Sequence, residues 1–454
     1  MSEAHDATPT AIPAKSQVQA ASWGDLVLRS GTVLAVRVIG AGLGFAFNVA
    51  LARALGAEGL GIYHLALTFA LIASVVGRVG MDAAILKFGA TSYAEKDWSR
   101  LAAVHRMGMS TVLMCCGSIA TTTFLAADWI AITIYSNTAI ADPLRLMSLA
   151  SVPVSMFSLY GELLKAGQRQ ALSSIILGAA LPTINLLLLF IFAENIAVPS
   201  VACGIYLIST VLVWISGYVL WRRSLPRSYP IPSKSFKLGK LIATAMPMYG
   251  AAVADILMTF ADVLILGIFV TSIDVGIYSA AARTALLTRF LLLATSSVAA
   301  PRFAALHAAN DKEGVAKLAV RSTILTTLST MPLLLIFIVF PERILSLFGA
   351  QFEAGAQVLI VLTIGQFVNA ATGPVGYLLN MSGFHRIEGR IAVVGAVMTV
   401  GICFALIPAW GLLGAAAANA IATAACNLLR VYFAKSRLGI LMLPVPWALR
   451  AGHK

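Results

Sequence analysis

Charged residues are scarce in this sequence. Only 11% of its 454 residues are Asp, Glu, Lys or Arg, while 59% are hydrophobic. The mean hydropathy is +0.89. A water-soluble domain of this length needs far more polar surface than that. The shortage of charge therefore excludes a soluble globular protein and indicates that lipid covers much of the apolar surface.

Cysteine is also scarce, and motifs for common enzyme chemistry are absent. The five cysteines all lie within apolar runs, and no pair has C-x-x-C spacing, so we interpret them as packing residues. The sequence contains neither the phosphate-binding pattern G-x-x-x-x-G-K-[ST] nor the zinc motif H-E-x-x-H. We therefore predict that the chain is not an enzyme, that ATP does not drive it directly, and that it holds no metal or organic cofactor.

What the sequence has in abundance is apolar runs long enough to cross a bilayer. We predict twelve spans in two groups of six. The first group is expected at about 26–54, 59–85, 101–126, 142–165, 170–193 and 197–221, and the second at about 241–270, 275–300, 315–340, 355–381, 387–408 and 412–436. The basic, Pro- and Ser-rich segment 222–240 separates them. This pattern predicts an all-α membrane protein with six-helix bundles at 24–221 and 241–436.

Lys and Arg are unevenly distributed between the two sides of these spans. One side collects 23 of them in its tails and loops, whereas the other holds only Arg53, Arg145 and Arg343. Cytoplasmic loops are enriched in Lys and Arg. We therefore predict a cytoplasmic linker at 222–240 and two cytoplasmic tails, a disordered one at 1–23 and another at 437–454. Because the charge is not gathered on one soluble face, we expect no nucleic acid partner.

The two groups of spans resemble each other at an offset near 215 residues. The tripeptide Gly61–Tyr63 recurs as Gly276–Tyr278, and Leu163–Leu164 recurs as Leu378–Leu379. Six spans is an even number, so both copies have the same orientation in the membrane. We expect a pseudo-two-fold axis along the membrane normal, with two bundles facing each other across a central cavity. That architecture suits transport by alternating access.

Three stretches together resemble one protein family. They are Ala52–Phe69 (ARALGAEGLGIYHLALTF), the segment Phe348–Arg390 and Ile407–Ala420 (IPAWGLLGAAAANA). In order and spacing they are similar to Wzx-type polysaccharide-export flippases of the multidrug/oligosaccharidyl-lipid/polysaccharide (MOP) exporter superfamily. The similarity covers nearly the whole chain after residue 24. It implies a V-shaped fold like that of the multidrug (MATE) exporters of this superfamily.

This resemblance also implies a function. Its members move an undecaprenyl-diphosphate-linked oligosaccharide from the cytoplasmic to the periplasmic leaflet of the bacterial inner membrane, for O-antigen, exopolysaccharide or capsule synthesis. The expected partners are this lipid-linked oligosaccharide and the surrounding membrane lipid. A polysaccharide polymerase and a chain-length regulator are further candidate partners.

Ionisable residues at membrane depth are costly, so they usually face a cavity or a partner. In the first group, counting from a turn near 57–58 places Arg37 opposite Arg78. Two guanidinium groups at one depth can grip a diphosphate by bidentate hydrogen bonds. Asp82, one turn beyond Arg78, can hold it in place or take part in ion coupling. The alternative is that both arginines simply extend to the cytoplasmic interface.

In the second group, a turn near 272–273 places Asp262 opposite Arg283 and Asp255 opposite Arg289. We expect the arginines to attract the anionic carrier. We expect the aspartates to bind a coupling proton or Na⁺, because a carboxylate in a low-dielectric cavity can exchange a proton. The alternative is a set of structural ion pairs that only hold this hairpin together.

Amide side chains also occur within the spans, at Asn48, Asn185, Gln366, Asn369, Asn380 and Asn419. They can hydrogen-bond sugar hydroxyls, or they can join helices. The rival function is a cation-coupled drug or metabolite exporter of the same superfamily. Such an exporter needs a more acidic or aromatic lumen for cationic drugs, whereas arginines within the spans favour an anionic substrate.

Overall fold

The computed structural model describes residues 23–192, 198–226 and 236–444. In these three ranges every regular element is a helix. Much of the predicted linker, residues 227–235, and the greater parts of both predicted tails, 1–22 and 445–454, lie outside the described residues. The described start of the C-terminal tail is packed, because Ile440 and Met442 are buried against the second half of the chain.

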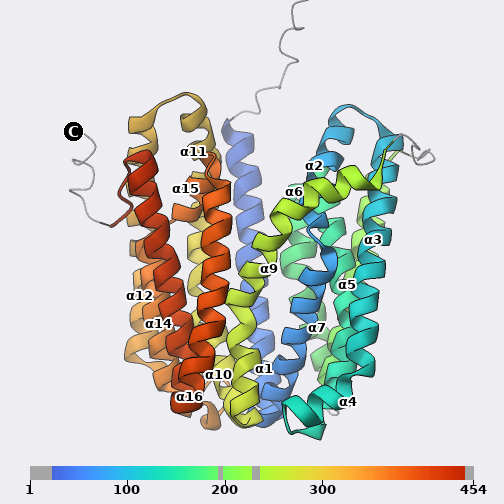
Figure 1. The fold of residues 1–454 in the computed structure, drawn as a ribbon, viewed down its shortest axis with the longest axis vertical. Helices are drawn as coiled ribbons and strands as arrows, with labels where there is room; N and C mark the ends of the chain where they lie inside the picture. Colours follow the sequence, from blue (N-terminus) through green and yellow to red (C-terminus); the bar gives the residue numbers. More distant parts are fainter. Residues whose placement is uncertain (1–22, 193–197, 227–235, 445–454) are drawn as a thin grey trace, which may run out of the picture.

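The first half of the chain forms one bundle (Figure 1). Its first element, α1 (Trp23–Arg78), is two helices joined at Gly56, where φ is 68° and ψ is −177°. A positive φ costs glycine little, so the chain can reverse there. The other elements are α2 (Met81–Ala94), α3 (Trp98–Leu125), α4 (Ala127–Trp129), η1 (Ile130–Ile134), η2 (Thr138–Ile140), α5 (Ala141–Ala166), α6 (Gln170–Ser174), η3 (Ile175–Ala179), α7 (Ala180–Ile191) and α8 (Pro199–Arg223).

The second half forms the other bundle, built in the same way. Its last element, α16 (His385–Leu438), is again two helices, joined at Gly411 with φ 53° and ψ −125°. The preceding elements are α9 (Leu238–Phe269), α10 (Ser272–Ala285), α11 (Thr288–Ala308), α12 (Lys312–Val339), α13 (Pro341–Leu345), η5 (Ala350–Gly355), α14 (Ala356–Ala371) and α15 (Val375–Met381).

The described helices account for the predicted number of spans. Ten helical stretches are long and apolar enough to cross a membrane. The first and last of them each contain two helices, because the chain turns at Gly56 and Gly411. The described part of the chain thus makes twelve crossings, as the sequence predicts. The second crossing differs in detail, since it breaks at Val79 and Gly80, both with positive φ, and continues into α2.

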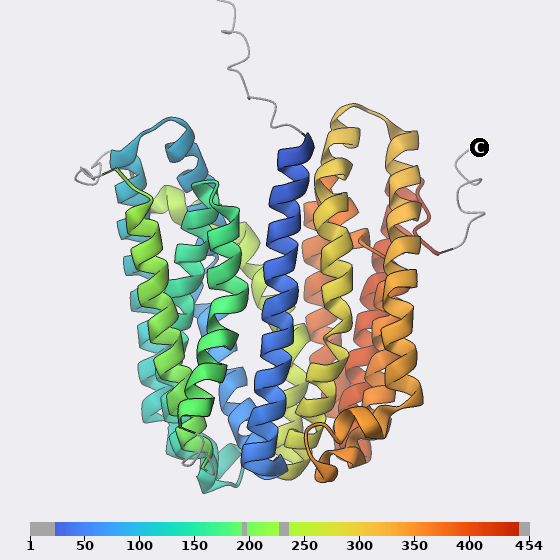
Figure 2. The same cartoon turned by 180° about the vertical axis from the view of Figure 1, so that it is seen from behind.

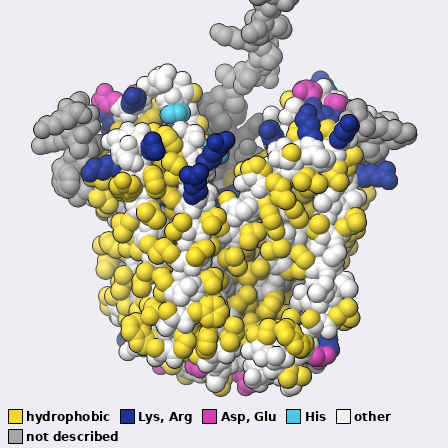
Figure 3. Space-filling view, in the orientation of Figure 1, with side chains coloured by type: hydrophobic (Ala, Val, Ile, Leu, Met, Phe, Trp, Pro, Cys, Tyr) yellow, Lys and Arg dark blue, Asp and Glu magenta, His cyan; other side chains and the backbone are white. Residues whose placement is uncertain are grey.

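The two bundles form a V (Figures 1 and 2). They converge at the end that holds the turns at Gly56 and Gly411. They separate toward the end where α1 begins and α16 finishes. Lys and Arg side chains gather at this wider end, while hydrophobic side chains cover the flanks of the molecule (Figure 3). We call the two ends the basic end and the closed end.

Contacts between the bundles seal the closed end. Arg53 Nε donates to the carbonyl oxygen of Leu347 at 2.7 Å, and Asn137 Nδ2 donates to Ser272 Oγ at 3.0 Å. Each contact joins a residue of the first bundle to one of the second. These contacts hold the two bundles together at this end.

Candidate functional site

A cavity of about 530 Å³ lies between the two bundles. Its walls come from the first helix of α1, from the segment running from α6 to the start of α7, and from α10 and α11. The charged residues that line it are Arg37, Lys165 and Arg283, and none of its described lining residues is acidic. Lys165 is paired with Glu162 at 3.3 Å, which leaves the two arginines as the cations that face the cavity without a carboxylate partner among the described residues. The cavity therefore suits an anionic ligand.

Arg37 extends from the first helix of α1. Among the described residues it makes no hydrogen bond or ion pair, and its side chain is exposed to the cavity. The helix that carries it is held close to η3, since a Cβ atom on Gly40 would lie only 2.6 Å from the carbonyl oxygen of Gly178. Arg37 is thus a free cation on a firmly packed helix.

Arg283 extends from α10 on the opposite wall. Its guanidinium carbon lies 5.2 Å from the ring centroid of Phe260, within range for a cation–π contact. It also lines a second, much smaller cavity together with Asp262. Arg283 therefore stands at the junction of two cavities, with no carboxylate close enough to form an ion pair with it in the described part of the chain.

Asp262 is satisfied by neutral groups instead. Its side chain is only 2% exposed. Its carboxylate accepts hydrogen bonds from Tyr278 Oη at 2.5 Å and from Asn419 Nδ2 at 2.9 Å. Asp262 and Arg283 do lie near each other, as the hairpin count predicts, but they do not form an ion pair within 4.0 Å among the described contacts.

Asp255 and Arg289 likewise share a cavity without bonding to each other. Both side chains are exposed and line a third cavity of about 120 Å³. Neither takes part in an ion pair with another described residue. The alternative of two structural ion pairs in this hairpin is therefore wrong for both pairs.

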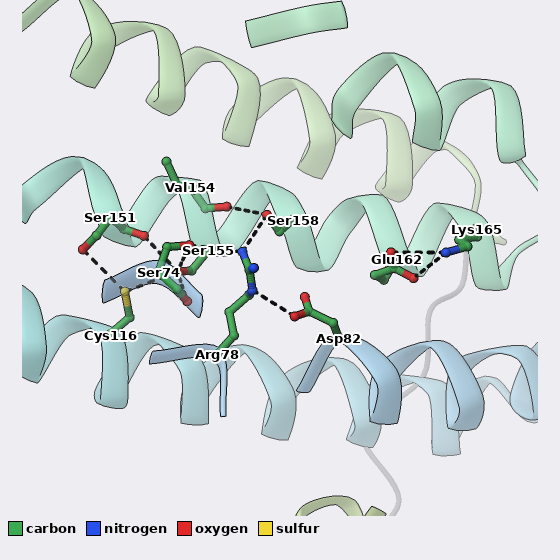
Figure 4. A network of polar contacts seen from close by, with 10 residues as sticks. All are labelled: Ser74, Arg78, Asp82, Cys116, Ser151, Val154, Ser155, Ser158, Glu162 and Lys165. Carbon is green, nitrogen blue, oxygen red and sulfur yellow. Dashed lines mark hydrogen bonds and ion pairs between the residues drawn. The ribbon is translucent and has the colours of Figure 1, made fainter. Parts of the chain in front are cut away.

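Arg78 lies elsewhere, inside the first bundle (Figure 4). It forms an ion pair with Asp82 at 2.9 Å, and it donates to Ser74 Oγ at 3.1 Å and Ser158 Oγ at 3.0 Å. Its side chain is 15% exposed, and it is not among the residues that line the main cavity. Asp82 does hold Arg78 in place as expected. The expectation that Arg78 stands with Arg37 in one site is corrected, since Arg283 is the arginine that shares the cavity with Arg37.

The predicted amide side chains lie in different parts of the structure. Asn48 lines the main cavity, with Nδ2 donating to the carbonyl oxygen of Gly44 at 2.7 Å. Gln366 and Asn369 line the third cavity. Asn185 is buried within α7 and is not a described lining residue of any of these cavities.

Sequence reasoning found Asn419 in the polar wall of the third cavity but missed its three neighbours there. Asn419, Thr423, Asn427 and Arg430 line this cavity from the second helix of α16. Their spacing of four, four and three residues places them on one helical face. A search for polar residues at helical spacing within the apolar run 412–436 would have found them.

Comparison with known proteins agrees with this architecture. Residues 27–307 match the family described as polysaccharide biosynthesis protein, and residues 247–407 match the MatE family. The probable low-salt glycan biosynthesis flippase Agl15 of Haloferax volcanii is 26% identical over 180 residues, which are 39% of this chain and 38% of that protein. The chain therefore matches well under half of the length of this curated relative.

Solved structures show the same fold. An inward-facing multidrug resistance MATE family transporter of the MOP superfamily superimposes with a TM-score of 0.73 at 14% identity, covering 94% of this chain and all of that one. The lipid II flippase MurJ in an inward closed conformation gives 0.71 at 14% identity, covering 90% of this chain and 87% of that one. The V-shaped MOP fold is thus confirmed. The match to the polysaccharide biosynthesis protein family, residues 27–307, spans more than half of the chain. This multi-pass membrane protein therefore belongs to that family.

Proposed function

We propose that this protein is a flippase for a lipid-linked saccharide whose head group carries a diphosphate. The observation that carries the proposal is the pairing of Arg37 and Arg283 across a cavity that has no described acidic lining residue. Family membership and the similarity to the probable glycan biosynthesis flippase of Haloferax volcanii support the same class of substrate. The proposed substrate is an undecaprenyl-diphosphate-linked oligosaccharide, such as an O-antigen, exopolysaccharide or capsule repeat unit.

The chemistry of the two arginines fits a diphosphate. A guanidinium group is planar and always charged, and it can donate two parallel hydrogen bonds to phosphate oxygens. One arginine on each bundle means that a bound diphosphate is held from both sides of the V. The two arginines and the diphosphate partly neutralise each other's charge. This lowers the free-energy cost of moving the head group into the membrane.

The direction of transport follows from charge and shape. We propose that the basic end faces the cytoplasm of a bacterial inner membrane, with both termini on that side, as the distribution of Lys and Arg favours. The head group would enter from there and leave toward the periplasm when the closed end opens and the basic end closes. The saccharide would then be available to a polymerase and a chain-length regulator.

We further propose that a proton or Na⁺ gradient drives the cycle through Asp255, Asp262 and Asp82. Asp255 is the best placed of the three, because it faces the third cavity and forms no ion pair with any residue that the structure describes. Asp262 is enclosed by hydrogen bonds, and Asp82 is paired with Arg78. Binding of a cation at Asp255 would alter the charge balance beside Arg289 and, through it, the hold on an anionic head group.

The match of residues 247–407 to the MatE family keeps a second candidate in view, a cation-coupled drug or metabolite exporter. The two candidates differ in the charge of their substrate. A lining with unpaired arginines and no described carboxylate repels a cationic drug, so we favour the flippase.

The test is reconstitution into proteoliposomes with a fluorescent undecaprenyl-diphosphate-linked saccharide, scored by its loss from the outer leaflet. We expect Arg37→Ala and Arg283→Ala each to slow flipping by at least about tenfold, the equivalent of 1.4 kcal/mol. Arg106→Ala is the matched control, since Arg106 is exposed on α3 and does not line the cavity. Flipping at the wild-type rate in both cavity variants would refute the site.

A further inference from the structure

The third cavity is a polar chamber within the second bundle. Its amide side chains come from α14 and α16 and its hydroxyl groups from α9 and α16, and its acidic and basic side chains are Asp255, Arg289 and Arg430. We define the amide chamber as the cavity lined by Asp255, Arg289, Gln366, Asn369, Asn419, Thr423, Asn427 and Arg430. So many polar groups at membrane depth are costly unless they face a cavity or bond to one another, and such a group of residues is a candidate functional site.

The amide chamber adjoins the cavity that holds the two arginines. Leu286 lines all three cavities, and Arg283 lines the first two. Gln366 and Asn419 line the second and the third. A head group bound at Arg283 is therefore next to a series of polar side chains that leads into the amide chamber.

Hydrogen bonds fix the direction in which these amides point. Arg430 is held by Glu388 through contacts of 2.8 and 2.9 Å, and it donates to Asn427 Oδ1 at 3.4 Å. Asn427 Nδ2 then donates to Asn369 Oδ1 at 3.2 Å, and Asn369 Nδ2 donates to Gln366 Oε1 at 3.3 Å. Because each bond uses a carbonyl oxygen as its acceptor, the orientation of every amide in the series follows from that of Arg430.

An amide series of this kind keeps capacity for a ligand. Each amide nitrogen carries two hydrogens and each amide oxygen has two lone pairs. Asn427 uses both of its hydrogens, because Nδ2 also donates to the carbonyl oxygen of Thr423 at 3.0 Å. Asn369 Nδ2 uses one hydrogen in the described contacts, and each amide oxygen of the series accepts one bond, so a second hydrogen and three lone pairs are left for a ligand. Gln366 Nε2 ends the series without a described partner. Fixed donors and acceptors side by side match adjacent hydroxyl groups on a sugar ring, each of which both donates and accepts.

We propose that the amide chamber binds the sugar residue attached directly to the diphosphate and selects lipid carriers by that sugar. This inference rests on the proposed function, because the sugar is placed by a diphosphate bound at Arg37 and Arg283. The volume of about 120 Å³ suits one sugar ring rather than an oligosaccharide. Asp255 accepts from hydroxyl groups, while Arg289 donates to hydroxyl or acetamido oxygens.

The experiment compares the affinity of the purified protein for undecaprenyl diphosphate with its affinity for undecaprenyl diphosphate-N-acetylglucosamine. In the wild type we expect the sugar to tighten binding at least fivefold. Asn369→Leu and Asn427→Leu should reduce that gain to less than twofold while binding of the sugar-free lipid stays unchanged. Asn380→Leu is the matched control, because Asn380 is exposed on α15 and lies outside the chamber.

The outcomes separate this inference from the proposed function. Failure of the wild type to bind either lipid would overturn both the sugar site and the proposed function. Binding of both lipids equally well, or an undiminished sugar gain in the two chamber variants, would overturn the sugar site alone. A sugar gain that persists in the chamber variants while the Na⁺ or pH dependence of binding changes would overturn the sugar site and leave the chamber with only the cation role proposed for Asp255. Asn369→Ser and Asn427→Ser, with smaller polar side chains, repeat the comparison if the leucine variants lower the melting temperature.

Discussion

Gly61 and Gly276 lie against each other where the two bundles meet near the closed end. A Cβ atom on Gly61 would overlap the carbonyl oxygen of Ser272, and one on Gly276 would overlap the carbonyl oxygen of Ala57. The two overlaps are equivalent, because Ala57 corresponds to Ser272 at the same offset that relates the glycines. The repeated Gly-Ile-Tyr sequence therefore marks the crossing of α1 and α10 beside the pseudo-two-fold axis.

Gly61→Ala should weaken this crossing, because the added methyl group meets backbone that cannot move aside. Overpacking of this kind costs about 1–3 kcal/mol. We expect a lower melting temperature and a larger fraction of molecules with the closed end open, measured by labelling of a cysteine placed at Ser272. Gly204→Ala is the control, since a Cβ atom there meets nothing within 4 Å. Equal behaviour of the two variants would show that the crossing tolerates a side chain.

Arg78→Ala should reduce stability more than Arg37→Ala does. Arg78 loses an ion pair and two hydrogen bonds within the first bundle, whereas Arg37 has no described partner. Hydrogen bonds to charged groups contribute about 1.5–3 kcal/mol each when buried, and less when partly exposed. Thermal unfolding in detergent compares the two variants. The same loss of stability in both would contradict the separation of a structural from a cavity-facing arginine.

The sequence predicts the architecture well and the site only in part. Apolar length, the distribution of Lys and Arg and the Gly-Ile-Tyr repeat are sufficient for twelve spans in two bundles. Counting from a hairpin turn gives the depth of a residue but not the direction in which it points around the helix. Arg37 and Arg78 are therefore equivalent in the count, while the break at Val79 and Gly80 and the hydrogen bond to Ser158 of α5 place Arg78 inside a bundle.

The amide chamber illustrates a different limit. Gln366 and Asn369 are visible in the sequence as amides within a span, but their role depends on Asn427, which is distant along the chain and adjacent in space. Helical spacing can show that Asn427 and Arg430 share a face of α16. Which helix that face meets is decided by packing between crossings, and a single sequence does not specify it.

Linking the bundles across the closed end should stop transport. Asn137 and Ser272 come from different bundles, and their side chains meet at 3.0 Å. Cysteines at both positions, joined by a short thiol-specific reagent, would hold this end shut. We expect flipping in proteoliposomes to fall to background after linking, with each single-cysteine variant and the unlinked double variant as controls. Transport that continues in the linked protein would rule out opening at this end.

Asp255→Asn should abolish the dependence of flipping on an ion gradient more completely than Asp262→Asn does. Asp262 keeps two of its three hydrogen bonds when it becomes an amide, because Tyr278 and Asn419 can still donate to the side-chain oxygen, and only the bond from the backbone N–H of Val263 is lost. Asp255 faces the amide chamber beside Arg289 with no ion-pair partner, so removal of its charge removes the anion that a proton or Na⁺ would neutralise. The measurement is the initial flipping rate with and without an imposed proton or Na⁺ gradient, in proteoliposomes that contain equal amounts of each variant.

Glu353→Gln, an exposed acidic position outside the described lining of the three cavities, serves as the charge-matched control. If Asp255→Asn responds to the gradient as the wild type does while Asp262→Asn does not, coupling passes through the buried carboxylate, and the hydrogen bonds from Tyr278 and Asn419 must rearrange during the cycle.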